Sequence, residues 1–168
     1  QQFSTMQINS LTTGQIAALD SAQLDTLTTA QLTGINTVQV SAIQTTDLAS
    51  ISTNLIAGLN TAQVVALTTG QIAALRTDQI SSIETIDIKV LAPFQIVAFN
   101  SAQIQALTTN GQIQSLNTAQ IRAIETTDLA GLSSDQIPVL NSAQIGALSA
   151  TQISALDSNQ IIVLTTTQ

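Results

Sequence analysis

The sequence repeats every eight residues, and no other feature restricts the possible folds as strongly. Written a to h from its large apolar residue, the octad is clearest at 67–74, Leu-Thr-Thr-Gly-Gln-Ile-Ala-Ala. Position a is Leu, Ile or Phe in all twenty-one octads from Phe3 onward, and position f is Leu, Ile or Val wherever it occurs. A one-residue insertion around Asn110-Gly111, interpreted as a tolerated bulge or a docking protrusion, shifts the register once. Units this short bury their apolar residues only against neighbouring units, so we expect a repeat architecture.

Positions b and e predict a helix start in each octad. Position b is Ser, Thr, Asp or Asn in sixteen of the twenty-one octads, and these side chains cap the free N–H groups of a first helical turn. Position e, three residues later, is Gln in seventeen octads, which is the spacing of a capping box. A polar track that binds a glycan or another chain is the alternative interpretation of this row. The structural capping role is assigned to Gln15, Gln23, Gln63, Gln71, Gln95, Gln103, Gln120, Gln136 and Gln144.

The spacing of the apolar positions favours helix over strand. Positions f and a are three residues apart, whereas a strand would bury residues of one parity. One uninterrupted helix is excluded, because eight residues advance about 2.2 turns and the apolar stripe would rotate by about 80° per octad. We therefore predict an all-α solenoid, with a cap at b and a very short helix from c to about a in each octad. A β-solenoid is the alternative, favoured by the Thr, Ile and Val content.

One octad contains a proline at position g, Pro138. Proline lacks the N–H that a regular helix would use there, so we expect this octad to be 3₁₀-like or frayed.

A longer period of about five octads overlies the short one. We predict a single continuous domain over 1–168, with higher-order repeats at 43–82, 83–123 and 124–163. Each of these repeats carries an acid at position e in place of Gln: Asp47, Asp87 and Asp128. The three carboxylates are candidate cation ligands, since hard cations take oxygen ligands, or they are acids favourably placed in a first helical turn. A superhelical turn of five octads would stack them, and any other number would scatter them.

Composition excludes several classes of function. The chain has no Cys and no His, which removes thiolate chemistry and the commonest general base and metal ligand. Only three residues are Lys or Arg, too few for a nucleic-acid surface. No apolar run approaches the roughly 18 residues of a membrane-spanning helix. We expect neither an enzyme nor a cofactor, no nucleic-acid partner and no membrane insertion.

The octads 67–75, Leu-Thr-Thr-Gly-Gln-Ile-Ala-Ala-Leu, and their variants resemble the Leu-Thr-Thr-x-Gln-Ile-x-Ala-Leu tandem tracts of large secreted bacterial surface proteins, often labelled adhesin-like. The resemblance covers essentially the whole chain and implies an extracellular or cell-surface location in bacteria. It implies a structural role as a rod, a stalk or an end-to-end filament, whose partners are further copies or flanking repeats of a larger polypeptide. The alternative is a recognition module that binds glycan, ice or a host protein through a Thr/Gln face.

Overall fold

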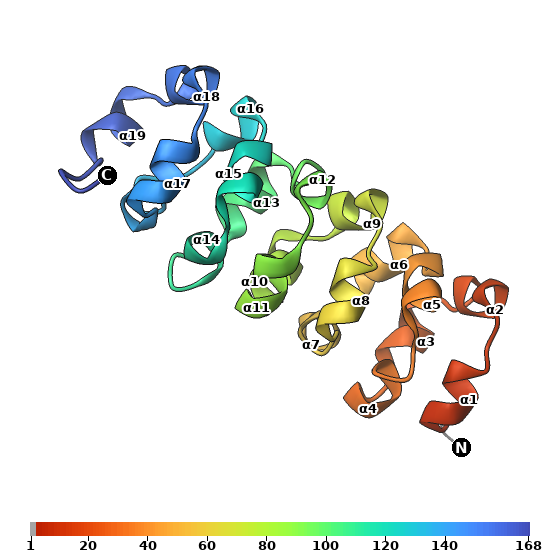
Figure 1. The fold of residues 1–168 in the computed structure, drawn as a ribbon. Coiled ribbons are helices and arrows are strands. Elements are labelled where there is room, and N and C mark those ends of the chain that lie inside the picture. The colour runs from red at the N-terminus through yellow and green to blue at the C-terminus, as the bar shows by residue number, and fades with distance from the viewer. Residues whose placement is uncertain (1–2) are drawn as a thin grey trace. The chain divides into compact units, whose positions relative to one another are not determined.

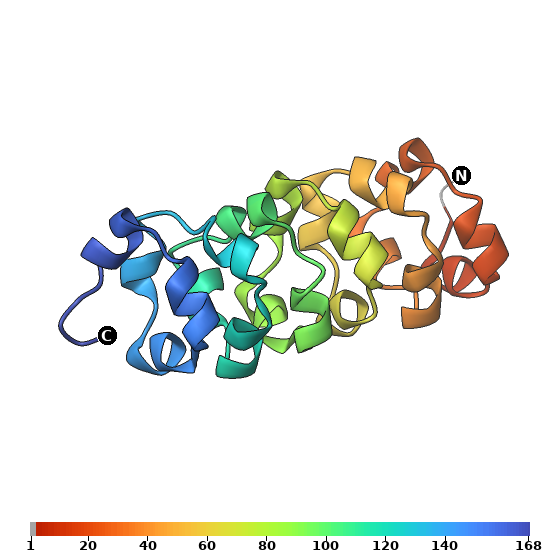
Figure 2. The same ribbon diagram turned by 90° about the horizontal axis from the view of Figure 1, so that it is seen from above.

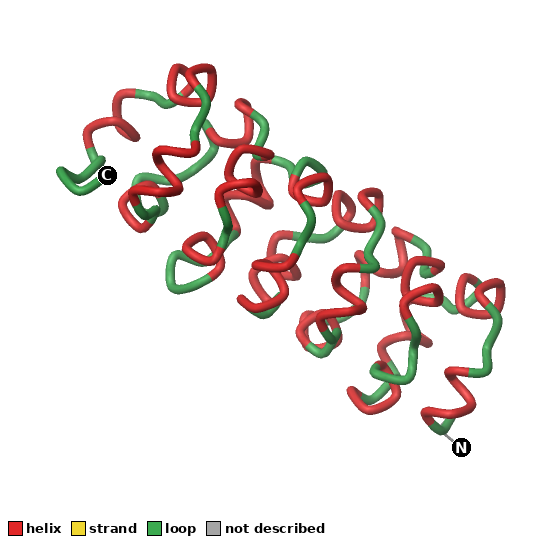
Figure 3. Tube along the Cα trace, viewed as in Figure 1, coloured by secondary structure: helices red, strands yellow, loops and turns green. Residues whose placement is uncertain are grey.

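The computed structural model describes residues 3–168 and contains helices joined by short connections. In this described part there are nineteen α-helices, one 3₁₀ helix and no strand (Figure 3). The all-α prediction is therefore confirmed, and the β-solenoid alternative is wrong. The chain divides into two compact units, Gln1–Ile83 and Glu84–Gln168, and each is described by itself. The single continuous domain over 1–168 stays a prediction.

Unit 1 contains ten of the helices, one for each octad (Figure 1). They are α1 (Thr5–Asn9), α2 (Thr13–Ala17), α3 (Ser21–Asp25), α4 (Thr29–Leu32), α5 (Thr37–Ala42), α6 (Thr45–Ser50), α7 (Thr53–Ala57), α8 (Thr61–Val65), α9 (Thr69–Ala74) and α10 (Thr77–Ser82).

Unit 2 continues the same alternation of short helix and cap. Its elements are α11 (Thr85–Val90), α12 (Pro93–Ile96), α13 (Ser101–Ala106), α14 (Gln112–Ser115), α15 (Thr118–Ala123), α16 (Thr126–Leu129), η1 (Ile137–Val139), α17 (Ser142–Ala147), α18 (Ala150–Ala155) and α19 (Ser158–Ile162). The 3₁₀ helix η1 contains Pro138, which lacks the N–H that a regular α-helix would use. The expectation of a 3₁₀-like octad at this proline is confirmed.

The helices begin at position c, as the capping pattern predicts, but they end earlier than expected. In α8, Asn60 accepts from the backbone N–H of Gln63 at 3.1 Å, and the Gln63 side chain accepts from the backbone N–H of Asn60 at 2.9 Å. The prediction placed the helix end at about position a, whereas α9 ends before Leu75, which is extended (φ −60°, ψ 141°). The extended residue turns the chain off the helix axis toward the next cap, so position a belongs to the connection.

The short helices stack in each unit on helices that lie three octads away. In unit 1, α1 packs on α4, α2 on α5, α6 on α9 and α7 on α10. In unit 2, α11 packs on α14, α12 on α15 and α13 on α16. Figure 1 shows α1, α4, α7 and α10 along one edge of unit 1, and Figure 2 shows the same helices from above. Each unit is thus a solenoid, and helices of four to six residues, too short to be stable alone, are held by their neighbours.

The core lies inside this coil and consists of positions f and a. Ile72 and Leu75 in unit 1 and Ile121 and Ile124 in unit 2 are representative buried pairs. Full burial of such a side chain contributes about 1.5–3 kcal/mol. The small residue at position h permits close approach of adjacent turns: a Cβ added to Gly34 would lie 2.5 Å from Cγ2 of Thr5.

The insertion at Asn110-Gly111 is absorbed in the connection between α13 and α14. Gly111 has φ +146°, a conformation that residues with a Cβ rarely adopt. A Cβ there would also lie 2.8 Å from Oγ1 of Thr85. Glycine therefore allows one extra residue while the capping interaction is kept, with the backbone N–H of Thr108 donating to Oε1 of Gln112 at 2.9 Å.

Candidate functional site

Every buried polar or charged side chain among residues 3–168 lies at position e of its octad. Thirteen of these residues are glutamines, and the other two are Asp87 and Asp128. Buried polar groups are costly unless they are hydrogen-bonded. This row is therefore the chemical feature of the fold that most needs a structural explanation.

The oxygen of each position-e amide caps the start of its own helix. For all nine glutamines assigned from the sequence, Oε1 accepts from the backbone N–H of position b at 2.8–3.0 Å. At Ala92 and Arg76, whose side chains do not cap the helix, Gln95 and Gln79 still accept from the position-b N–H, at 3.0 and 2.9 Å. The glutamine half of the capping box is thus kept even where the position-b half is missing.

The nitrogen of the same amide reaches the preceding turn. Nε2 of Gln71 donates to the carbonyl oxygens of Val40 at 2.9 Å and Ile43 at 2.8 Å, which lie 31 and 28 residues earlier. In unit 2, Nε2 of Gln144 donates to the carbonyls of Ile113 and Leu116 at 3.1 and 2.8 Å, at the same separations. The acceptors belong to positions f and a at the end of a helix. The carbonyl of Val40 also accepts from the backbone N–H of Ile43 at 3.2 Å, so the amide uses its second lone pair, whereas the carbonyl of Ile43 lies just beyond the last helical residue.

One glutamine therefore links the start of its own helix to the end of a helix in the turn before. The pattern recurs in unit 1 at Gln39, Gln63, Gln71 and Gln79 and in unit 2 at Gln120, Gln136, Gln144, Gln152, Gln160 and Gln168. We call this row the glutamine ladder. Each ordinary hydrogen bond contributes about 0.5–1.5 kcal/mol, and leaving a buried partner unsatisfied costs about 1–3 kcal/mol.

The sequence contains a signal for this inter-turn role that the capping interpretation did not use. A capping box accepts Glu as readily as Gln, and the helix dipole favours an acid in the first turn. Position e nevertheless has seventeen glutamines and no glutamate. Only the amide supplies an acceptor for the cap and donors for the preceding turn, so the exclusion of Glu indicates a second use of the side chain.

The first turn of unit 1 departs from the ladder. Gln7, Gln15 and Gln23 are exposed, and Nε2 of each donates to no residue within 3–168. Their capping bonds are intact, for example 2.8 Å from the backbone N–H of Thr12 to Oε1 of Gln15. No described residue packs on this side of the turn, so the donors lack the carbonyls that their equivalents use elsewhere.

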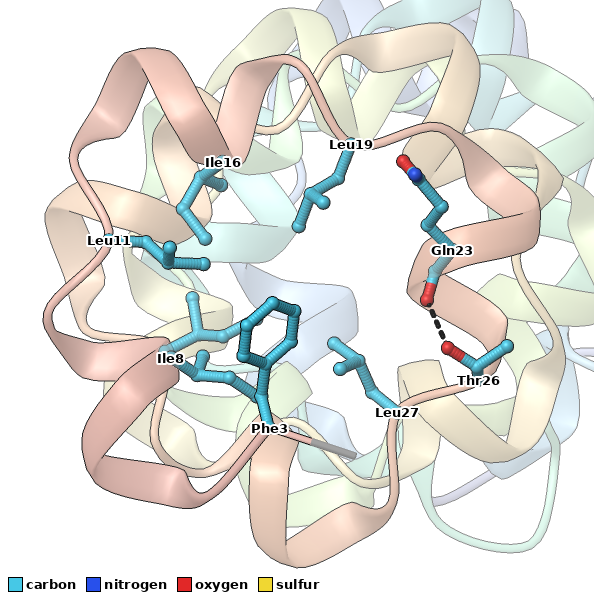
Figure 4. A pocket seen from close by; sticks show the side chains of 9 residues that line it. Phe3, Ile8, Leu11, Ile16, Leu19, Gln23, Thr26 and Leu27 are labelled. Atoms are coloured by element: carbon cyan, nitrogen blue, oxygen red, sulfur yellow. Dashed lines mark hydrogen bonds between the residues drawn. The ribbon is translucent and has the colours of Figure 1, made fainter. Parts of the chain in front are cut away.

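The same turn encloses an apolar cavity of about 160 Å³. Figure 4 shows Leu11, Ile16, Leu19 and Leu27 pointing into the centre of the ring of helices, with the aromatic ring of Phe3 beside them. The other residues lining the cavity are Ile8, Gln23, Thr26 and Ile35. The position-a leucines Leu11, Leu19 and Leu27 are only half-buried here, whereas their equivalents from Ile35 to Leu140 are buried.

A family model described as the ALTTAQ repeat matches residues 40–77, 80–118, 110–142 and 138–166. These matches span well over half of the chain and follow one another in tandem. The chain belongs to the ALTTAQ repeat family. No curated protein matches it.

The ALTTAQ letters correspond to positions h, a, b, c, d and e of the octad, so the family pattern ends on the ladder residue. Residues 66–71 read Ala-Leu-Thr-Thr-Gly-Gln, and 27–31 read Leu-Thr-Thr-Ala-Gln. In the ALTTAQ pattern, the Leu is the core residue of position a and the first Thr is the cap of position b. The final Gln is the ladder residue that connects one turn of the solenoid to the turn before.

The acids that replace the ALTTAQ glutamine have separate environments. Oδ1 of Asp47 accepts from the backbone N–H of Ser21 at 3.2 Å, and Oδ1 of Asp128 accepts from Oγ of Ser101 at 2.6 Å. Asp87 is 2% exposed, and its Oδ1 has no hydrogen-bond partner. Inter-turn contacts within each unit span 24–32 residues and not the 40 that would stack these acids. The described residues hold no group of three or more acids placed to bind a metal ion.

The ALTTAQ octad with arginine at position b carries an exposed ion pair. Nε of Arg76 lies 3.0 Å from Oδ1 of Asp78, and the Arg76 guanidinium also donates to the carbonyls of Ala49 and Ile51. The hydrogen bond from Arg76 lowers the pKa of Asp78 below its ordinary value of 3.8.

None of the described helices has the length and apolar character needed to cross a membrane.

Proposed function

We propose that this ALTTAQ chain is a structural element, a segment of a rod or stalk at the bacterial cell surface whose length depends on the number of octads. The observation that carries the proposal is the glutamine ladder. Each rung, such as Gln71 with Val40 and Ile43, uses a buried amide to join successive turns and leaves it unavailable to a ligand. In this proposal the protein acts by its length and is not an enzyme.

The repetition of one rung supports this role. A solenoid whose turns contact only their neighbours gains stability additively with each repeat, so it can be lengthened without redesign of the core. The ladder adds a directional hydrogen bond to each of these contacts. Location at the bacterial surface follows from the likeness of these tracts to those of large secreted proteins, and it is part of the same proposal.

Particle length after insertion tests the proposal. A variant in which residues 51–74, three whole octads of unit 1, are duplicated in tandem is expected to fold and to be longer by a constant increment in small-angle X-ray scattering and electron microscopy. The control inserts four residues after Leu59, which displaces the ladder register by half an octad, and it is expected to lose stability. A duplication variant that folds without becoming longer would show that octad number does not determine length.

Recognition of glycan, ice or a host protein through a Thr/Gln face remains the alternative. Burial of the interior glutamines removes the Gln half of such a face, so only the Thr and Ser residues of positions b, c and d would be left to bind. Binding on a glycan array, or inhibition of ice recrystallisation, would support this alternative over a purely structural role.

A further inference from the structure

We propose that Asn110 is a modification site, at which the side-chain amide is lost as ammonia and the residue becomes aspartate or isoaspartate. Asn110-Gly111 lies in the connection between α13 and α14, where the extra residue is inserted, and it is the only Asn-Gly pair in the sequence. The reactants are the side chain of Asn110, the backbone nitrogen of Gly111 and water. The inference does not depend on the proposed structural role.

The reaction proceeds through a cyclic imide. The backbone nitrogen of Gly111 gives its proton to a solvent base and attacks Cγ of Asn110, so that a C–N bond forms. The bond from Cγ to Nδ2 breaks, and ammonia leaves with a proton from solvent, which completes a succinimide ring. Water then adds to one of the two ring carbonyls and breaks its bond to the ring nitrogen. Opening at the side-chain carbonyl gives aspartate, and opening at the backbone carbonyl gives isoaspartate.

The attacking nitrogen of Gly111 is open to this reaction. Gly111 has no Cβ beside the nitrogen, whereas each of the other asparagines is followed by Ser, Thr, Leu or Gln. The backbone N–H of Gly111 donates to no acceptor among residues 3–168. The nitrogen therefore approaches Asn110 without a steric obstacle and without giving up a hydrogen bond.

The side chain of Asn110 is equally free, which distinguishes it from the other asparagines. Asn110 is exposed, and its amide has no hydrogen-bond partner in the described part of the chain. Three other asparagines lie inside α1, α7 and α19, where the helical ψ must change before the ring can close. The remaining five are N-caps, and their Oδ1 atoms accept from the backbone N–H of position e: Asn36, Asn60, Asn100, Asn117 and Asn141.

Isoaspartate at this position would change the backbone of the connection. It inserts a methylene group into the main chain between Thr108 and Ile113, where the carbonyl oxygen of Thr108 accepts from the N–H of Ile113 at 3.2 Å. Gly111 also lies close to α11, since a Cβ there would be 2.8 Å from Oγ1 of Thr85. We expect the longer connection to weaken both contacts, and with them the packing of α14 on α11.

Peptide mapping by mass spectrometry of the folded protein, incubated in mildly alkaline buffer, tests the proposal. Asn110 is expected to show the mass increase of an amide replaced by a carboxyl group before any other asparagine does. Hydroxylamine gives a second readout, because it attacks the succinimide and is expected to cleave the folded chain into 1–110 and 111–168. Asn110→Ser is expected to abolish this cleavage.

Thr118→Gly provides a matched control. It creates a second Asn-Gly pair at Asn117, which is also exposed but whose Oδ1 accepts from the backbone N–H groups of Ala119 and Gln120. Because that cap must break first, Asn117 is expected to deamidate about fivefold more slowly than Asn110 in the folded variant. In urea the two sites are expected to react at similar rates. Circular dichroism verifies that the variant is folded.

Asn110→Asp separates the effect of charge from that of the longer backbone. It carries the charge of the modified residue on an unaltered main chain. The isoaspartate form, purified by chromatography, is expected to melt about 2–4 °C below Asn110→Asp, the shift that corresponds to the loss of about one hydrogen bond in a chain of this length.

Three results would overturn the proposal. The first is an Asn110 that keeps its amide in the folded protein and loses it only in urea, which would show that the turn protects it. The second is an Asn117 in folded Thr118→Gly that reacts as fast as Asn110, which would show that the free side chain does not select the site. The third is an isoaspartate form that melts like Asn110→Asp, which would show that the connection accepts the longer backbone without loss.

Discussion

Nε2 of Gln71 donates to the carbonyl oxygen of Ile43 at 2.8 Å, although 28 residues separate them in the sequence. The same side chain accepts from the backbone N–H of Thr68 at 2.9 Å and is 1% exposed. Gln15 lies in an identical stretch of nine residues, since 11–19 and 67–75 have the same sequence. Gln15 makes the same cap but is exposed and lacks the inter-turn bonds. This pair separates the contribution of the ladder from that of the cap.

Gln71→Glu is expected to lower the free energy of unfolding by about 3–5 kcal/mol, because it buries a carboxylate against the carbonyls of Val40 and Ile43. The matched control, Gln15→Glu, keeps its capping oxygen in solvent and is expected to change stability by less than about 0.5 kcal/mol. Urea unfolding followed by circular dichroism measures both. Equal losses in the two variants would show that Gln71 acts only as a cap.

Gly34→Ala is expected to destabilise unit 1 by about 1–3 kcal/mol, because the added Cβ would lie 2.5 Å from Cγ2 and 2.9 Å from the carbonyl oxygen of Thr5. At Gly146 in α17, an added Cβ meets nothing within 4 Å. Gly146→Ala is therefore expected to stabilise by up to about 1 kcal/mol through helix propensity. Differential scanning calorimetry compares the two, and a neutral Gly34→Ala would mean that the adjacent turns separate at little cost.

Asp87→Leu is expected to stabilise the protein by about 1–3 kcal/mol, because it removes a buried carboxylate oxygen without a hydrogen-bond partner. Leu55 occupies the equivalent position of another octad and is buried there. Asp128→Leu is the control, and it is expected to destabilise by about 1–2 kcal/mol because the hydroxyl of Ser101 loses its acceptor. Thermal unfolding measures both shifts. A loss of stability in Asp87→Leu would indicate that the carboxylate makes a favourable interaction.

Asp78 is expected to contribute to the acid sensitivity of the fold. Its pKa is lowered in the folded state by the hydrogen bond from Arg76, so its contribution is present above the ordinary value of 3.8 and is lost as pH falls through the lowered value. Asp78→Asn is expected to have a lower melting temperature than the wild type at neutral pH, and the difference is expected to disappear in strong acid. A difference independent of pH would exclude the ion pair as its cause.

Much of the local structure was predictable from the octad. Short-range signals predict the helix start at position c, the cap at b and the buried positions f and a, and these are present in α8, α9 and α15. The helix end was placed too late, because the extended conformation of residues such as Leu75 depends on the direction in which the next helix must start. The number of octads per turn depends on how side chains of successive turns fit together, and no local pattern encodes that fit.

The identical stretches around Gln15 and Gln71 show where the information in the sequence ends. In both, the sequence alone determines the helix start, the cap and the orientation of the side-chain amide, because all three depend on residues within one octad. Whether that amide is a buried rung or an exposed donor was decided only by the tertiary structure. A rung needs the carbonyls of a helix end about 28–31 residues earlier, and only the coiling of the chain brings them within reach.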